Sequence, residues 1–135
     1  MPKFVATDYA ITIGTANFSA SLNSVTLDIT TDEQETTAFG DTYRTRIAGL
    51  RDASLTLDFM QDFGAGSVDQ TLFPLLGSAV AWSIKPTSGT VTATNPSYSG
   101  TAVVTQYQPF ANAVGDLATL SVTWPVSGSV TRGTV

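Results

Sequence analysis

Strict alternation of apolar and polar residues recurs along this chain and limits its possible folds more than any other feature. In residues 25–29, 55–59 and 120–124 every second side chain is apolar, and the intervening ones are Thr, Ser or Asp. Successive side chains of a strand point to opposite faces, so each run predicts a strand with one buried and one polar face. Such faces must pack against another layer, which favours a sandwich or a barrel.

Further strand-forming runs lie between short turn sequences. Residues 9–13, 82–84, 90–93 and 101–107 have strand-forming composition, and they are separated by segments rich in Gly, Pro, Asn and Ser. Together with the alternating runs they predict about seven or eight strands, which is typical of a β-sandwich or a partly closed barrel. No repeat or linker divides residues 1–135, so we expect a single, mostly β domain.

One short flanking α-helix is expected over residues 67–77. Ser67 followed by Gln70 has the form of a capping box, and Gly77 is a typical helix end. Pro74 lacks a backbone N–H and crowds the preceding turn, so the helix should be short or kinked. Its Leu and Phe side chains are expected to pack on the sheet.

Two segments lack a strand pattern. Residues 30–50 mix acids and arginines with Phe39 and Tyr43 and do not resemble a tight hairpin turn, so we predict a long functional loop there. Residues 127–135 are mostly small and polar and contain glycine, which predicts an exposed C-terminal arm.

The composition argues against enzyme chemistry and for contact with other proteins. The chain has no histidine and no cysteine, which removes the commonest general base, the thiol nucleophile and two main metal ligands. We therefore predict no catalytic activity, no cofactor and no metal site. Only 13% of residues are charged, about half the usual share, so much of the surface is expected to meet protein. A net charge of −5 argues against DNA binding through clustered Lys and Arg side chains.

Several side chains permit other, less favoured interpretations. Acids could form a glycosidase pair or a calcium site, but they fit polar strand faces or the predicted loop better. Trp82, Trp124, Tyr98 and Tyr107 could form a glycan platform, although the tryptophans belong to the apolar series of a core. The start lacks a secretory pattern and no apolar stretch could span a bilayer, so no membrane association is expected. The acids considered are Asp28, Asp32, Glu33, Glu35 and Asp58.

Short motifs along nearly the whole chain resemble the major tail tube proteins of long-tailed siphophages. In addition to the predicted helix, the motifs are FVATDY (4–9), ETTAFGD (35–41), YRTR (43–46), GLRD (49–52), NPSYSG (95–100), YQPF (107–110) and VTWP (122–125). The resemblance implies a tail-tube-type β-sandwich in which six subunits close a ring. Stacked rings would form the hollow tail tube through which DNA passes during genome ejection. The alternative is an immunoglobulin-like virion decoration or glycan-binding module.

The same resemblance assigns the loop at residues 30–50 to the neighbouring ring. Pairing of its arginines with nearby acids of the same chain is the alternative. The expected inter-ring residues are Phe39, Asp41, Tyr43, Arg44 and Arg46.

The polar strand faces would, by the same resemblance, look into the lumen of the tube. An ordinary solvated outer face is the alternative. An acidic wall would repel phosphates and let DNA pass without specific binding. The expected lumen-facing residues are Thr26, Asp28, Thr56, Asp58, Ser121 and Thr123.

Partners and location also follow from the resemblance. The implied partners are further copies of the chain, a tape measure protein, a tail terminator and distal tail proteins. The implied location is the virion tail, after synthesis in the host bacterial cytoplasm.

Overall fold

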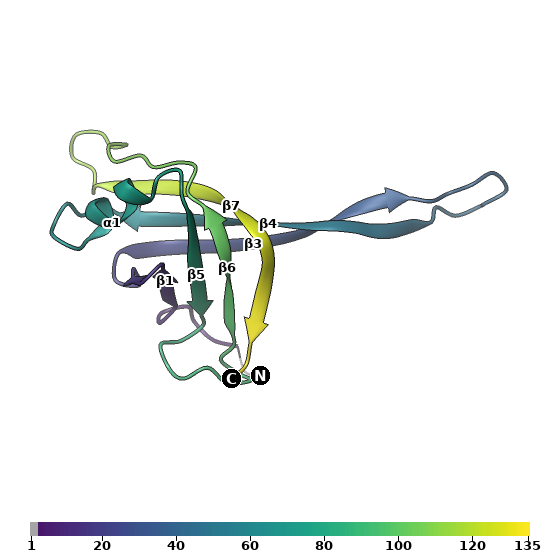
Figure 1. Cartoon of the computed structure of the whole chain (residues 1–135), viewed down its shortest axis with the longest axis horizontal. Coiled ribbons are helices and arrows are strands. Elements are labelled where there is room, and N and C mark those ends of the chain that lie inside the picture. Colours follow the sequence, from purple (N-terminus) through teal and green to yellow (C-terminus); the bar gives the residue numbers. More distant parts are fainter. Residues whose placement is uncertain (1–2) are drawn as a thin grey trace.

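The computed structural model describes residues 3–135 and contains one antiparallel sheet of seven strands and one helix (Figure 1). The strand order is β2-β1-β5-β6-β7-β4-β3. The predicted mostly β class with one short helix is confirmed, and the sheet stays open rather than closing into a barrel. The elements are β1 (Ala10–Ile13), β2 (Ala16–Asn17), β3 (Leu22–Glu35), β4 (Arg46–Met60), α1 (Val68–Leu75), β5 (Ala79–Lys85), β6 (Ser97–Val103) and β7 (Thr119–Gly133).

The sheet is folded into two halves by β7, which belongs to both. Its first part, up to Pro125, pairs with β4, and its second part, from Val126, pairs with β6. Gly128 has a positive φ of 87°, which glycine tolerates, and it lies where the register with β6 shifts. A side chain at Gly100 would come within 3.2 Å of the Ser129 carbonyl oxygen. Glycine at these places allows the sharp bend of β7 (Figure 1).

The hydrophobic core lies between the two halves of the sheet. The alternating residues of β4 and β7 form one side of it, as predicted, and β1, β5 and β6 supply the other. Phe18 packs edge-on against Phe59, with ring centroids 5.5 Å apart. Burying each large apolar side chain contributes about 1.5–3 kcal/mol. The main core residues are Ile11, Ile13, Phe18, Leu55, Leu57, Phe59, Val80, Trp82, Ala102, Leu120, Val122 and Trp124.

Helix α1 starts after Ser67, as predicted, and contributes Val68 and Leu72 to the core. The predicted capping box is not formed, since the Ser67 side chain makes no capping hydrogen bond. The expectation that the Leu and Phe side chains of this segment pack on the sheet is wrong for Phe73 and Leu76, which are 64% and 46% exposed. A short helix buries a single stripe, and neighbouring residues point about 100° apart around its axis.

The segment predicted to be a long loop is about half strand, and residues 36–45 remain a loop at its tip. β3 continues to Glu35 and β4 begins at Arg46, so residues 30–50 form a two-stranded hairpin that extends beyond the rest of the molecule (Figure 1). We call residues 30–50 the projecting hairpin. The sequence pattern missed these strands because no apolar row runs through them, and backbone hydrogen bonds between the strands hold them together instead.

Two smaller expectations are also corrected. Residues 127–133 are not a C-terminal arm, since β7 continues through them and pairs with β6. Residues 90–93 form no strand, and the one bridge there joins Thr92 to Asn95. The buried Asn95 side chain accepts the Thr87 N–H at 3.0 Å, so local side-chain hydrogen bonds organise this loop in place of a strand ladder.

Candidate assembly surfaces

The six side chains predicted to face a lumen lie together on one face of the sheet. Strand pairing places Thr56 between Thr26 and Thr123, and it places Asp58 opposite Ser121. The hydroxyl oxygens of Thr56 and Thr123 are 3.2 Å apart and share a hydrogen bond. Two further members, on the same rows of β3 and β4, were missed from the sequence. This surface, which we call the polar face, comprises Ser24, Thr26, Asp28, Ser54, Thr56, Asp58, Ser121 and Thr123.

The polar face carries acids but no basic side chain. Asp28 and Asp58 lie on it, and the strand segments that form it, residues 22–30, 52–60 and 119–125, contain no Lys or Arg. Its side chains are exposed or half-buried, in contrast to the rows on the opposite side, which are buried on β4 and β7 and half-buried at Val25 and Leu27 of β3. Such a surface repels anions and offers hydroxyls for weak, exchangeable hydrogen bonds.

β3 forms an open edge of the sheet. It is the last strand in the order, and within residues 3–135 no other strand pairs with its outer side. At 14 residues it is long for an edge strand, and it contains neither proline nor lysine, two common devices that block edge pairing. Its outward backbone N–H and C=O groups are therefore available to a further strand.

The projecting hairpin has no buried side chain. The row of side chains on one side of β3 is apolar as far as Ile29. Beyond it the same row is polar, at Thr31, Glu33 and Glu35. Every residue from 30 to 50 is exposed, because the other half of the sheet does not reach this far. An isolated two-stranded hairpin is marginally stable in water, so contact with another surface would stabilise it.

Two ion pairs lie along the projecting hairpin. Arg44 pairs with Glu35 at 2.9 Å, and Arg46 pairs with Glu33. Both arginines therefore pair with acids of the same chain, which was the alternative to a contact with the neighbouring ring. Exposed ion pairs stabilise a protein by at most about 1 kcal/mol, so a competing acid on another molecule can displace them at little cost.

At the tip of the projecting hairpin, the predicted interface residues divide into two groups. Asp41 accepts the Ala38 N–H at 2.8 Å and Gly40 has a φ of 93°, so these residues shape the turn. Phe39 is fully exposed and Tyr43 is 85% exposed. Aromatic side chains are enriched at the centres of protein interfaces, which makes this pair a candidate binding tip.

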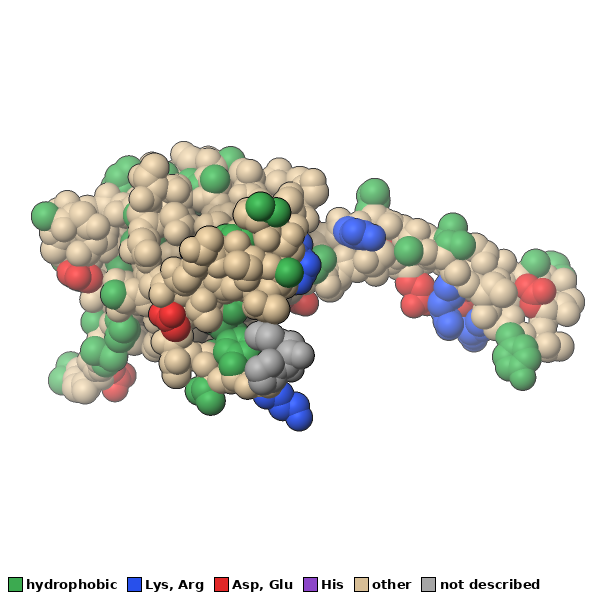
Figure 2. Space-filling model, turned by 90° about the horizontal axis from the view of Figure 1, so that it is seen from below, with side chains coloured by type: hydrophobic (Ala, Val, Ile, Leu, Met, Phe, Trp, Pro, Cys, Tyr) green, Lys and Arg blue, Asp and Glu red, His purple; other side chains and the backbone are tan. Residues whose placement is uncertain are grey.

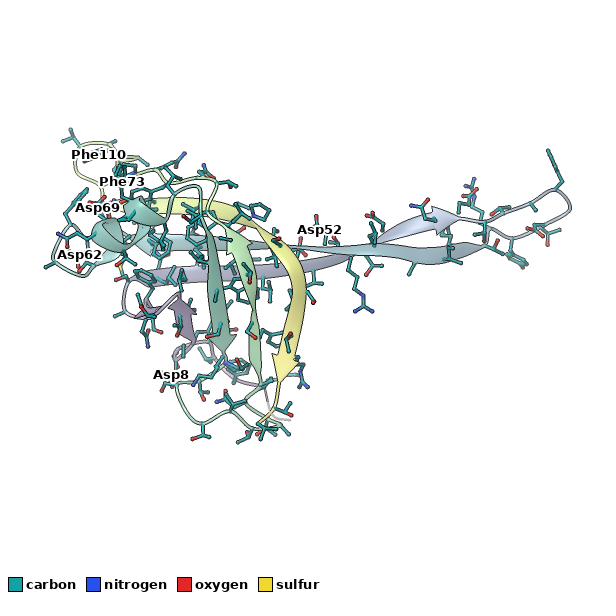
Figure 3. The ribbon with its side chains drawn as sticks, viewed as in Figure 1. Asp8, Asp52, Asp62, Asp69, Phe73 and Phe110 are labelled. Atoms are coloured by element: carbon teal, nitrogen blue, oxygen red, sulfur yellow. The ribbon has the colours of Figure 1, made fainter. Side chains whose placement is uncertain are left out.

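A second exposed aromatic cluster lies at the end of the molecule opposite the projecting hairpin (Figure 3). Phe63 stacks on Phe110 with ring centroids 5.6 Å apart, and Phe73 projects from α1 at the same end. All three rings are at least half exposed. We call Phe63, Phe73 and Phe110 the end patch. No sequence pattern indicated this patch, because its members come from three separate segments.

Hydrogen bonds fasten the loop that carries Phe110. Tyr107 donates to Asp69 Oδ1 at 2.6 Å, and Gln61 donates to both Tyr107 Oη and the Pro109 carbonyl oxygen. Burial, and then the hydrogen bond to Asp69, raise the pKa of Tyr107 above its ordinary value, so the phenol keeps the proton that it donates. The end patch is therefore supported before any partner binds.

The charged residues near the end patch are acidic. Asp62 and Asp69 lie at the same end (Figure 3), and Asp116 belongs to the loop that carries Phe110. The chain contains no Lys or Arg in residues 53–84 or 86–131. Three of its six basic residues, in contrast, lie on the projecting hairpin or directly at its base (Figure 2).

The acids weighed earlier as catalytic or calcium-binding groups do not converge. Asp28 and Asp58 lie on the polar face, while Glu33 and Glu35 are in ion pairs. Within residues 3–135, no group of three or more acids is placed to hold a metal ion. The part of the chain that the structure describes also has no helix long and apolar enough to cross a membrane.

The two tryptophans considered for a glycan platform are core residues. Trp82 and Trp124 are 2% and 0% exposed. Trp124 donates its indole N–H to the Gln106 carbonyl oxygen at 3.0 Å, whereas the indole N–H of Trp82 has no partner among the described residues. Core packing, the favoured interpretation from the sequence, is confirmed for both.

Comparison with known proteins identifies the fold. No protein-family model matches the chain, and no curated protein sequence matches it. Among solved structures, the fold is similar to that of a chain in the virion of a native gene transfer agent particle, with a TM-score of 0.74 at 14% sequence identity. The similarity covers 93% of this chain and 95% of that chain. The two chains therefore share one fold along nearly their whole length.

Proposed function

We propose that this protein is a structural virion protein, namely a tail tube subunit that polymerises as stacked hexameric rings around a channel for DNA. The observation that carries the proposal is the polar face, which is spread over three long strands and bordered by the open edge of β3. The gene transfer agent chain of the same fold belongs to a virion, which supports a virion role here. This function is mechanical and requires no catalysis.

Ring closure would join the open edge of β3 to a strand of the adjacent copy. Three strands per copy, spaced about 4.8 Å and tilted by about 40°, give six copies a wall roughly 36 Å across. That width admits a DNA duplex beside a layer of side chains. A closed ring would also bury a strand edge that otherwise invites uncontrolled aggregation.

The polar face would line the channel. It carries Asp28 and Asp58 without any basic side chain, and each copy has a formal net charge of −5. DNA phosphates would be repelled from such a wall, so the genome would slide without specific binding. In this arrangement the apolar faces of the same strands keep their place in the core of each subunit.

The projecting hairpin would reach the next ring. It is exposed throughout, and its tip presents Phe39 and Tyr43 away from the body of its own subunit. Contact with a neighbouring ring would give this marginal element the packing that its own chain does not supply.

Negative-stain electron microscopy across a concentration series tests the proposed function. We expect rings or tubes with a central hole, which become longer and more abundant as the concentration rises. A monomer at every concentration, also after addition of tail-tip proteins of the same virion, would contradict the proposal. A sugar-dependent rise in the melting temperature of that monomer would instead favour the decoration or glycan-binding module.

The double substitution Tyr43→Ala with Arg44→Ala tests the role of the projecting hairpin. Both side chains are exposed, so the monomer should stay folded while the yield of long tubes falls. The matched control is Lys3→Ala with Phe4→Ala, another adjacent exposed basic and aromatic pair, which should form tubes normally. A wild-type tube yield from the hairpin variant would refute an inter-ring role for its tip.

A further inference from the structure

The projecting hairpin and the end patch lie at opposite ends of the longest axis of the molecule (Figures 1 and 3). β3 and β4 run out into the hairpin at one end, and at the other end β4 leads through Phe63 into α1. Two different surfaces at opposite ends form a heterologous pair if they bind each other. Such a contact does not close into a dimer but repeats from copy to copy, as a ring or as an open helical array.

The two surfaces are alike in their exposed aromatic side chains. The tip of the projecting hairpin offers Phe39 and Tyr43 on a narrow turn, while the end patch offers a stacked pair of rings beside a helix. Aromatic pairs attract each other beyond the effect of the area that they bury. The hydrogen bonds of Tyr107 already hold the end patch, so docking would not have to order it.

Charge complementarity also favours contact between the two surfaces. Arg44 lies next to Tyr43, its side chain is 71% exposed, and one hydrogen bond to Glu35 occupies it. An arginine side chain has five N–H donors, so most of its donors remain free. Exposed Asp62 lies at the same end as the end patch, and Asp116 is exposed in the loop that carries Phe110. Residues 53–84 and 86–131 contain no Lys or Arg.

We propose that the tip of the projecting hairpin docks on the end patch of a second copy of this chain. Phe39 and Tyr43 would pack against Phe63, Phe73 and Phe110, and Arg44 would face Asp62 and Asp116. The inference rests on the proposed function and names the acceptor surface that the hairpin meets in the next ring. Each copy then donates one tip and accepts another, so the contact extends indefinitely along the tube.

Introduced cysteines test this contact directly, because the natural chain has none. The variant Ala38→Cys with Ala113→Cys carries one thiol at the hairpin tip and one in the loop of the end patch, both at exposed positions. A short bis-maleimide should link assembled copies into a ladder of covalent multimers on a denaturing gel. Either single variant should give at most dimers, because one thiol per chain cannot propagate.

The matched control is Ala38→Cys with Ala93→Cys, which moves the second thiol to the exposed loop between β5 and β6. Micrographs of the same samples separate this inference from the proposed function. Tubes with a ladder above the control support both, whereas tubes with no such ladder overturn the acceptor surface alone. A ladder without tubes supports the docking contact and overturns the tube function, and neither product overturns both.

A second measurement uses the critical concentration for assembly. Phe63→Ala with Phe110→Ala removes the stacked pair and should raise that concentration at least about tenfold, as loss of an interface hot spot does. Phe4→Ala, at a half-exposed aromatic far from both surfaces in sequence, should leave it unchanged. Circular dichroism confirms folding of each variant. An unchanged critical concentration in the Phe63 and Phe110 variant would overturn the proposed docking site.

Discussion

β3 and β4 each pass through two regions that differ in the interactions that stabilise them. Within the body, Leu55, Leu57 and Phe59 of β4 are completely buried beneath the other half of the sheet. Within the projecting hairpin, Ile47 and Leu50 of the same strand are 60% and 81% exposed. The backbone ladder continues through both regions, apart from shifts of register between Leu22 and Ser24 and between Thr31 and Glu33.

This difference separates folding from assembly along one pair of strands. Backbone hydrogen bonds alone contribute little net stability, because water competes for them, whereas buried large apolar side chains contribute about 1.5–3 kcal/mol each. The body therefore has the interactions needed to fold alone. The projecting hairpin lacks them, so its order in solution depends on exposed ion pairs and on any partner that it meets.

The largest expected effect comes from Trp124→Ala, which should lower the free energy of unfolding by about 3–5 kcal/mol. Trp124 is completely buried and donates a hydrogen bond to the Gln106 carbonyl oxygen. Phe39→Ala, at the tip of the projecting hairpin, should change the same quantity by less than about 0.5 kcal/mol. Urea unfolding of the monomer, followed by circular dichroism, measures both. Similar losses in the two variants would break the comparison.

A smaller difference should appear inside β4 of the wild-type monomer. Amides of residues 54–58, which lie between β3 and β7, should exchange with solvent only through large openings, and those of residues 46–51 through local opening that costs at least about 2 kcal/mol less. Hydrogen-exchange mass spectrometry resolves these segments. Assembly into tubes should slow exchange in the projecting hairpin most. Equal protection of both regions in the monomer would show that the hairpin is stable without a partner.

The smallest expected effect concerns Tyr107→Phe, which should cost about 1 kcal/mol at neutral pH by removing the hydrogen bond to Asp69. Because the pKa of Tyr107 is raised in the folded state, its contribution is complete below the ordinary tyrosine pKa. That contribution is lost as the pH rises through the folded-state pKa. The stability gap between the wild type and the variant should therefore narrow above about pH 10. A gap that widens in alkali would contradict this assignment.

The alternating runs allowed much of the body to be predicted from the sequence. A period of two assigns each residue to a face whatever the neighbouring strand is, so the buried row and the polar row of β4 were both predicted correctly. The helix after Ser67 followed from local chemistry in the same way. Local signals also misled where side-chain hydrogen bonds replaced a ladder, as around Asn95.

Composition and the period of two showed from the sequence alone that β4 and β7 bury one row of side chains and that the charge is low and acidic. They did not decide burial where no second layer covers a strand, since Ile29 of the same alternating pattern is 48% exposed. Tertiary structure alone decided where the surfaces lie. It extended β3 and β4 into the projecting hairpin, because the backbone ladder continues where the apolar row stops. It also brought Phe63, Phe73 and Phe110 to one end, since no local pattern relates three segments that only the folded chain brings together.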